Sequence, residues 1–75
     1  MLPDVLSRRI VRDVYAFTRG APMQWVPVET IARRLVLSDE VMTDQAIELA
    51  RRKGWLDYAG GHSICLTEEG RRMAR

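Results

Sequence analysis

The sequence contains a single cysteine and a single histidine among its 75 residues. A lone thiol cannot form an internal disulfide, which is the usage expected of a protein in a reducing cytoplasm. Two side chains are too few for a structural zinc site. His62 and Cys65 are also three positions apart, so in one strand they would point to opposite faces. We therefore expect no metal site and no cysteine–histidine catalytic pair.

Long apolar segments and nucleotide-binding motifs are also missing. The apolar runs are short, and Arg8, Arg9 and Arg12 interrupt the first of them, so we expect neither a membrane span nor a signal peptide. The chain has no P-loop and no G-x-G-x-x-G motif. Its adjacent acidic pairs, at 39–40 and 68–69, are explained by helix starts. These absences favour a cytoplasmic protein without enzymatic activity, cofactor or membrane partner.

Basic and acidic residues nearly balance. The chain has twelve Lys and Arg and ten Asp and Glu, a formal net charge of +2, and eleven of the twelve cations are arginine. This charge is weak evidence for a nucleic-acid partner. The hydrophobic share of 47% and the charged share of 29% are ordinary for a folded domain, and 75 residues are too few for several domains. We expect one domain over residues 1–75.

The first amphipathic segment runs from residue 3 to residue 19. Apolar residues recur there at spacings of four, four and three, as on one stripe of a helix: Leu6, Ile10, Val14 and Phe17. Pro3 suits the first position of a helix, and Gly20 suits the left-handed residue that follows the last turn. On the polar face, Arg9 and Asp13 are spaced for an ion pair.

Two further helices are predicted in the middle of the chain. Residues 23–26 lie between prolines and suit a short extended segment. A short helix is expected over residues 28–35, with the stripe Val28, Ile31, Ala32 and Leu35. We expect Ser38 to be the N-cap of a longer helix that ends near Gly54. Its expected inward stripe is Met42, Ala46, Leu49 and Ala50, with Ile47 at the edge. Two consecutive helices of this kind form a helix-turn-helix candidate.

The last third of the chain predicts a hairpin and a final helix. Residues 55–58 and 63–66 both alternate, and the side chains assigned to the buried face are Leu56, Tyr58, Ile64 and Leu66. Between these segments, Gly60 and Gly61 suit a mirror-image turn, because glycine adopts positive φ at low cost. Thr67 is then expected to cap a helix from Glu68 to about Ala74.

The order of these elements resembles a winged helix-turn-helix domain. Residues 50–56 are similar to the end of a recognition helix that runs into the first wing strand, and residues 64–72 resemble the "LTxxGR" close of the wing in MarR-like bacterial regulators. The resemblance implies an α+β, mostly helical fold: a three-helix core, a two-stranded β wing and a short C-terminal helix. It also implies a small DNA-binding protein, a transcriptional regulator or accessory factor, with its third helix in the major groove of duplex DNA.

Six residues are the candidates for contact with nucleic acid under this hypothesis: Thr30, Ser38, Gln45, Arg51, Arg52 and His62. Gln45 is the best base reader, since its amide can bind adenine through two hydrogen bonds. Ser38 and Thr30 lie near helix starts, where a hydroxyl can contact phosphate or simply cap the helix. A single module of this charge would bind DNA weakly, so a homodimer or a protein partner is also expected.

The charge of the third helix supports a second hypothesis. Between Ser38 and Ala50 the sequence has no Lys or Arg, and a wheel of this helix turns Asp44 and Glu48 outward. Acidic side chains repel phosphate, so this face suits a basic protein surface better than DNA. The alternative is therefore a protein-interaction module that docks through Asp44, Glu48 and an exposed Trp25. For both tryptophans, packing in or beside the core is the simpler expectation.

Overall fold

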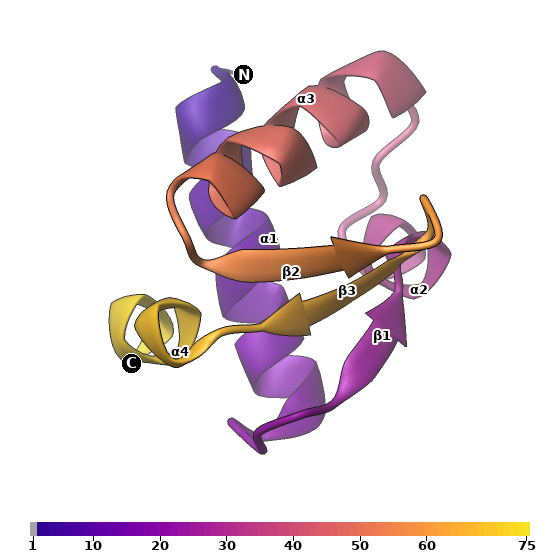
Figure 1. Ribbon diagram of the computed structural model, residues 1–75. Coiled ribbons are helices and arrows are strands. Elements are labelled where there is room, and N and C mark those ends of the chain that lie inside the picture. Colours follow the sequence, from indigo (N-terminus) through magenta and orange to yellow (C-terminus); the bar gives the residue numbers. More distant parts are fainter. Residues whose placement is uncertain (1) are drawn as a thin grey trace.

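The computed structural model describes residues 2–75, and over these residues it is a mostly helical α+β fold with four helices and one three-stranded antiparallel sheet (Figure 1). The elements follow in the predicted order: α1 (Pro3–Thr18), β1 (Trp25–Pro27), α2 (Val28–Arg34), α3 (Glu40–Arg52), β2 (Leu56–Ala59), β3 (Ser63–Leu66) and α4 (Glu68–Ala74). The long helix α1 lies across the sheet, α3 lies beside β2, and α4 lies at the end of the sheet opposite the hairpin tip (Figure 1).

Helix α1 has the predicted boundaries, because Pro3 lies in its first turn and left-handed residues follow its last one. The first left-handed residue is Arg19, at φ 55°, and Gly20 continues at φ 72°. The expected stripe is buried except for Phe17, which is 46% exposed. The prediction for Phe17 was wrong because its ring lies beside the Arg34 guanidinium, 5.0 Å from the ring centroid, outside the core. Arg34 also pairs with Asp13 of α1, at 2.8 Å, a contact between helices that the sequence did not predict.

The sheet has the strand order β1-β3-β2, so the predicted hairpin of β2 and β3 is joined by a third strand, β1. Val26 of β1 and Tyr58 of β2 both lie opposite Ile64 of the central strand. The turn between β2 and β3 is the expected one, with φ of 64° at Gly60 and 71° at Gly61. The predicted alternation of β3 is incomplete, because Cys65 is buried as well as its two neighbours.

Helix α3 differs from its prediction in two respects. Its N-cap is Asp39, whose side chain accepts a hydrogen bond of 3.0 Å from the Met42 backbone, so the prediction of Ser38 was wrong by one residue. Its buried stripe is Thr43, Ala46, Ile47 and Ala50. Ile47 is 1% exposed, not at the edge. Ala46 and Ala50 are buried as predicted, but Thr43 and Ile47 take the places expected for Met42 and Leu49, so the helix is rotated slightly relative to the prediction.

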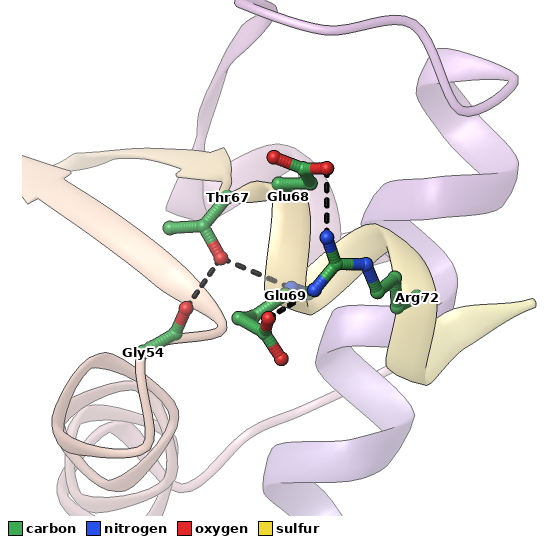
Figure 2. A network of polar contacts seen from close by, with 6 residues as sticks. Gly54, Thr67, Glu68, Glu69 and Arg72 are labelled. Atoms are coloured by element: carbon green, nitrogen blue, oxygen red, sulfur yellow. Dashed lines mark hydrogen bonds and ion pairs between the residues drawn. The ribbon is translucent and has the colours of Figure 1, made fainter.

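The junction between the hairpin and α4 explains the Thr-x-x-Gly sequence that closes the sheet. The Thr67 hydroxyl donates to the Gly54 carbonyl and accepts a hydrogen bond of 3.0 Å from the Gly70 backbone (Figure 2). The Thr67 backbone N–H also donates to the Trp55 carbonyl, at 3.1 Å. A Cβ at Gly70 would lie 2.1 Å from that same carbonyl, so only glycine fits there. The expected cap at Thr67 is confirmed, and the cap and the glycine together seat α4 against the turn of Gly54 and Trp55 that follows α3.

Candidate interaction surface on α3 and the hairpin

A groove of about 600 Å³ separates α2 and the start of α3 from the hairpin tip. Three sequence-predicted site residues line it: Ser38 from the turn before α3, Asp44 from α3, and His62 from the hairpin. Its other walls are apolar or carry charges that the sequence did not single out: Val28, Glu29, Ala32, Arg33, Val36, Leu37, Glu40, Thr43, Tyr58 and Gly61. The fold thus brings together the helix pair and the hairpin around one concave surface.

A second, shallower groove of about 420 Å³ runs along the outer side of α3. Gln45, Glu48 and Arg52 line it, and Asp44 lies between the two grooves because it lines both. The remaining predicted contacts, Thr30 and Arg51, line neither groove. The predicted outward face of α3 is therefore present, but the six candidate nucleic-acid residues do not form one continuous site.

The first groove carries uncompensated negative charge. Glu29 and Arg33 of α2 pair with each other at 2.8 Å, so these two charges cancel. Glu40 and Asp44 form no ion pair with any described residue, although most other carboxylates do. They are four positions apart on α3, where like charges lie side by side and destabilise a helix by roughly 0.2–0.5 kcal/mol. The helix N-terminus offsets this cost for Glu40, which lies in the first turn.

Tyr58 forms the hairpin wall of the groove. Its phenol donates a hydrogen bond of 2.7 Å to the Gly61 carbonyl, which holds the ring in place. Burial raises the pKa of this phenol, and the negative charges of Asp44 and Glu48 raise it further. Tyr58 and Asp44 line the same groove, so β2 and α3 face each other across it. Tyr58 was not predicted as a site residue, because the strand alternation assigned its side chain only to the buried face.

The two arginines at the end of α3, Arg51 and Arg52, form ion pairs with the Glu48 carboxylate. Glu48 accepts hydrogen bonds of 2.9 and 2.5 Å from Arg51 and lies 3.5 Å from Arg52. The hydrogen bond from Arg51 lowers the pKa of Glu48, and the charge of Arg52 adds to the effect. The two cations predicted to contact phosphate therefore already share one anion.

The hairpin tip and the turn before α3 offer little positive charge. The exposed His62 forms a hydrogen bond between its ring Nδ1 and the Gly60 carbonyl, and its neighbours at the tip are glycines. Ser38 is exposed and does not cap α3, while Thr30 is half-buried in α2. Among the described residues that line this groove, Arg33 is the one arginine, and it is paired with Glu29.

Trp25 lies apart from this surface. It is opposite Cys65 in the sheet register, on the face away from Tyr58 and the core, and it is 49% exposed. Trp25 is not among the side chains that pack against the core, so the expectation that it packs in or beside the core was wrong. The alternative site of Asp44, Glu48 and Trp25 is not one surface. Trp55 does pack against the core, with Arg8 and Lys53 5.7 and 5.0 Å from its ring centroid.

Comparison of the chain with models of protein families, with curated proteins and with solved structures finds no match. Among the described residues, no three metal-ligating side chains gather in a group that could hold an ion. None of the helices in residues 2–75 is both long enough and apolar enough to cross a membrane.

Proposed function

We propose that this chain is a winged-helix domain that acts as a non-catalytic interaction module and binds a basic protein surface through α3. In this assignment α2 and α3 are the helix-turn-helix, β2 and β3 are the wing, and β1 completes the sheet. The element order and the three-stranded antiparallel sheet support the assignment of the fold.

The observation that carries the functional proposal is the charge on α3 and the surface beside it. Asp44 and Glu40 are exposed without a cation among the described residues, and Glu48 holds the two arginines that follow it. A protein that binds duplex DNA gains most of its affinity by neutralising phosphates with Lys and Arg. This surface would bring carboxylates to the phosphates instead, so it is complementary to a basic protein.

Duplex DNA is the second candidate partner, and the placement of Gln45 favours it. This amide is exposed on the outer side of α3, where a recognition helix presents base-reading side chains. The ion pairs of Glu48 with Arg51 and Arg52 are exposed, and exposed ion pairs contribute little to stability, so phosphates could displace the carboxylate. Under this hypothesis the protein is a bacterial-type transcription regulator or accessory factor of the cytoplasm, and it binds as a homodimer.

Titration against mixed-sequence duplex DNA at about 50 and 200 mM salt separates the two candidates, because phosphate contacts give a steep salt dependence. We expect no binding by the wild-type protein. The variant Asp44→Gln/Glu48→Gln releases both arginines from Glu48 and should acquire weak DNA binding, with a logarithmic salt slope of about −1.8 for two new phosphate contacts. Steep, salt-dependent binding by the wild-type protein would establish DNA as the partner and overturn the protein proposal.

A basic polypeptide provides the opposite test. Poly-L-lysine should bind the wild-type protein, and Asp44→Gln/Glu48→Gln should weaken that binding. The matched control is Glu68→Gln/Glu69→Gln, which removes the same charge from α4, at the far end of the sheet (Figure 1). Equal weakening by both double variants would show that only the net charge matters and would contradict a docking face on α3.

A further inference from the structure

We propose that the groove between α2, the start of α3 and the hairpin tip binds an arginine side chain of an extended segment of the partner protein. This inference rests on the proposed function, since it specifies what the α3 side of the domain binds.

The apolar wall of the groove fits the stem of a long side chain. Its apolar atoms come from α2 and from the turn that follows it: Val28, Ala32, Val36 and Leu37. The volume of about 600 Å³ lies within the range of pockets that enclose small ligands, so one long side chain and its backbone fit inside. Arginine and lysine cover apolar surface with their methylene groups while the charged end reaches a polar rim.

The backbone conformation of Val36 is a second reason to expect that a partner covers this apolar wall. Val36 is 85% exposed and has a φ of 56°, a left-handed conformation that is rare for a β-branched residue. Glycine or asparagine would end α2 there at lower cost. A strained valine that is also exposed has no packing gain to offset its cost in the free protein. Contact with an apolar stem would provide that gain.

The acidic rim determines the charge of the occupant. Glu40 and Asp44 project from successive turns of α3 into the groove and lack a cation among the described residues. A guanidinium placed between them would relieve their mutual repulsion. Phosphate, nucleotide and carboxylate ligands would be repelled by the same pair.

Tyr58 favours arginine over lysine. Its ring lines the groove close to Asp44 and is fixed by the hydrogen bond to Gly61. A planar guanidinium can stack on such a ring and donate two hydrogen bonds to one carboxylate, whereas an ammonium group cannot do both as well.

The test is an NMR titration of the full chain, using its amide ¹H–¹⁵N spectrum and a short blocked peptide with one arginine among alanines. Two matched peptides carry citrulline, which has nearly the same shape without the charge, or lysine. We expect the arginine peptide to shift amides of the groove at millimolar concentration, the lysine peptide to bind more weakly, and the citrulline peptide to cause no comparable shifts.

Variants of the acidic rim locate the site. Asp44→Asn and Glu40→Gln should each lower the affinity for the arginine peptide by about two- to fivefold, the range expected for an exposed ion pair. The control is Asp57→Asn, which removes one exposed charge from the opposite face of the sheet and should leave the affinity unchanged. The spectrum of each variant also shows whether it is folded.

The remaining outcomes contradict the inference in distinguishable ways. Equal shifts with arginine and citrulline would show that charge does not select the occupant. Shifts confined to the second groove, around Gln45 and Leu49, would overturn the arginine site while leaving α3 as the docking face. Absence of shifts at millimolar peptide would overturn the arginine site as well. The proposed function has its own contradicting outcomes, which are steep salt-dependent binding of duplex DNA by the wild-type protein and equal weakening of poly-L-lysine binding by the two double variants.

Discussion

Gly70 is the residue on which the seating of α4 depends. It is buried, and a Cβ there would lie 2.1 Å from the backbone carbonyl of Trp55, which accepts a hydrogen bond from the Thr67 backbone. We expect Gly70→Ala to lower the free energy of unfolding by about 2–3 kcal/mol, the cost of overpacking a filled site. Urea denaturation measures this change.

Gly54 provides the comparison for Gly70. It has a φ of 79°, and a Cβ at this position would have no atom within 4 Å, so Gly54→Ala tests backbone conformation without a clash. This variant should cost about 1 kcal/mol, the typical cost of the left-handed region for alanine. A loss at Gly70 no larger than the loss at Gly54 would contradict the close approach.

Ser7 is a buried residue whose removal should stabilise the protein. It is fully buried in α1, and its hydroxyl has no hydrogen-bond partner among the described residues. An unsatisfied buried hydroxyl costs roughly 1–3 kcal/mol, so Ser7→Ala should raise the free energy of unfolding by about 1 kcal/mol. Thr43→Val is the control, because the Thr43 hydroxyl does donate to the Asp39 carbonyl, at 2.9 Å. Thermal unfolding that shows no gain for Ser7→Ala would indicate that its hydroxyl is satisfied in solution.

At the scale of elements, a charged cluster joins the first turn of α1 to the end of α3. Lys53 donates a hydrogen bond of 3.0 Å to Asp4, and Arg8 lies 3.3 Å from the same carboxylate. The hydrogen bond from Lys53 is the main cause that lowers the pKa of Asp4 below its ordinary value of 3.8, and the charge of Arg8 adds to it. This cluster ties the two helices together outside the core.

The lowered pKa predicts a loss of stability in acid. A carboxylate with a lower pKa in the folded state stabilises the protein above its unfolded pKa, and this contribution is lost as the pH falls through the folded value. The free energy of unfolding should therefore decrease below the ordinary pKa of 3.8, and Asp4→Asn should make that decrease shallower. Urea denaturation at a series of pH values measures both slopes.

The control for the acid prediction is Asp57→Asn, because Asp57 is an exposed carboxylate of β2 outside the cluster of Asp4, Arg8 and Lys53. Its pH profile should follow that of the wild-type protein. The wild-type decrease will not vanish in Asp4→Asn, since ion pairing also lowers the pKa of Glu48. Identical profiles for Asp4→Asn and the wild-type protein would show that the cluster does not form in solution.

The elements that the sequence predicted well are those with local signals. Pro3, the Gly60–Gly61 pair and the Thr67 cap each act within a few residues, and each lies where it was expected. The N-cap of α3 was predicted one residue too early, because Ser38 and Asp39 are adjacent and both are good N-cap residues. The sequence alone does not show at which of the two the helix begins. The rotation of α3 and the pairing of β1 with β3 depend on tertiary packing, which periodicity does not encode.

The candidate surface was harder to predict than the fold. The sequence showed that Asp44 and Glu48 face outward, and the structure agrees that both have solvent access. It did not show that Tyr58 of β2 would line the same groove as Asp44, because these residues lie far apart in the chain. Nor could it show that Glu48 forms ion pairs with both Arg51 and Arg52, since several acidic and basic residues of the chain have suitable spacing for such pairs.

At the scale of the whole molecule, the net charge conceals an uneven distribution. The formal charge is +2, yet the first turns of α3 and the adjacent groove are acidic. Many of the arginines are held by carboxylates of their own helix, including Arg8, Arg33, Arg51 and Arg72. Total charge governs solubility and long-range association, whereas a partner meets only the charges of the face that it contacts.

Val36 connects the stability of the whole fold to its proposed binding surface. Because its left-handed φ of 56° is strained for valine, Val36→Asn should raise the free energy of unfolding by about 1 kcal/mol. The same change removes apolar area from the groove, so it should lower the affinity for the arginine peptide while the fold becomes more stable. Urea denaturation and the peptide titration measure the two effects on one sample.

Val41→Asn is the matched control for this trade-off. Val41 is an exposed valine, at 67%, in the regular first turn of α3, and it does not line the groove. Valine and asparagine have similar helix propensities, so this change should alter the free energy of unfolding by no more than about 0.5 kcal/mol and leave peptide binding unchanged. If Val36→Asn instead destabilised the protein, Val36 would be a structural residue, and its exposure would need no partner to explain it. Greater stability together with weaker binding is the outcome that the groove geometry predicts.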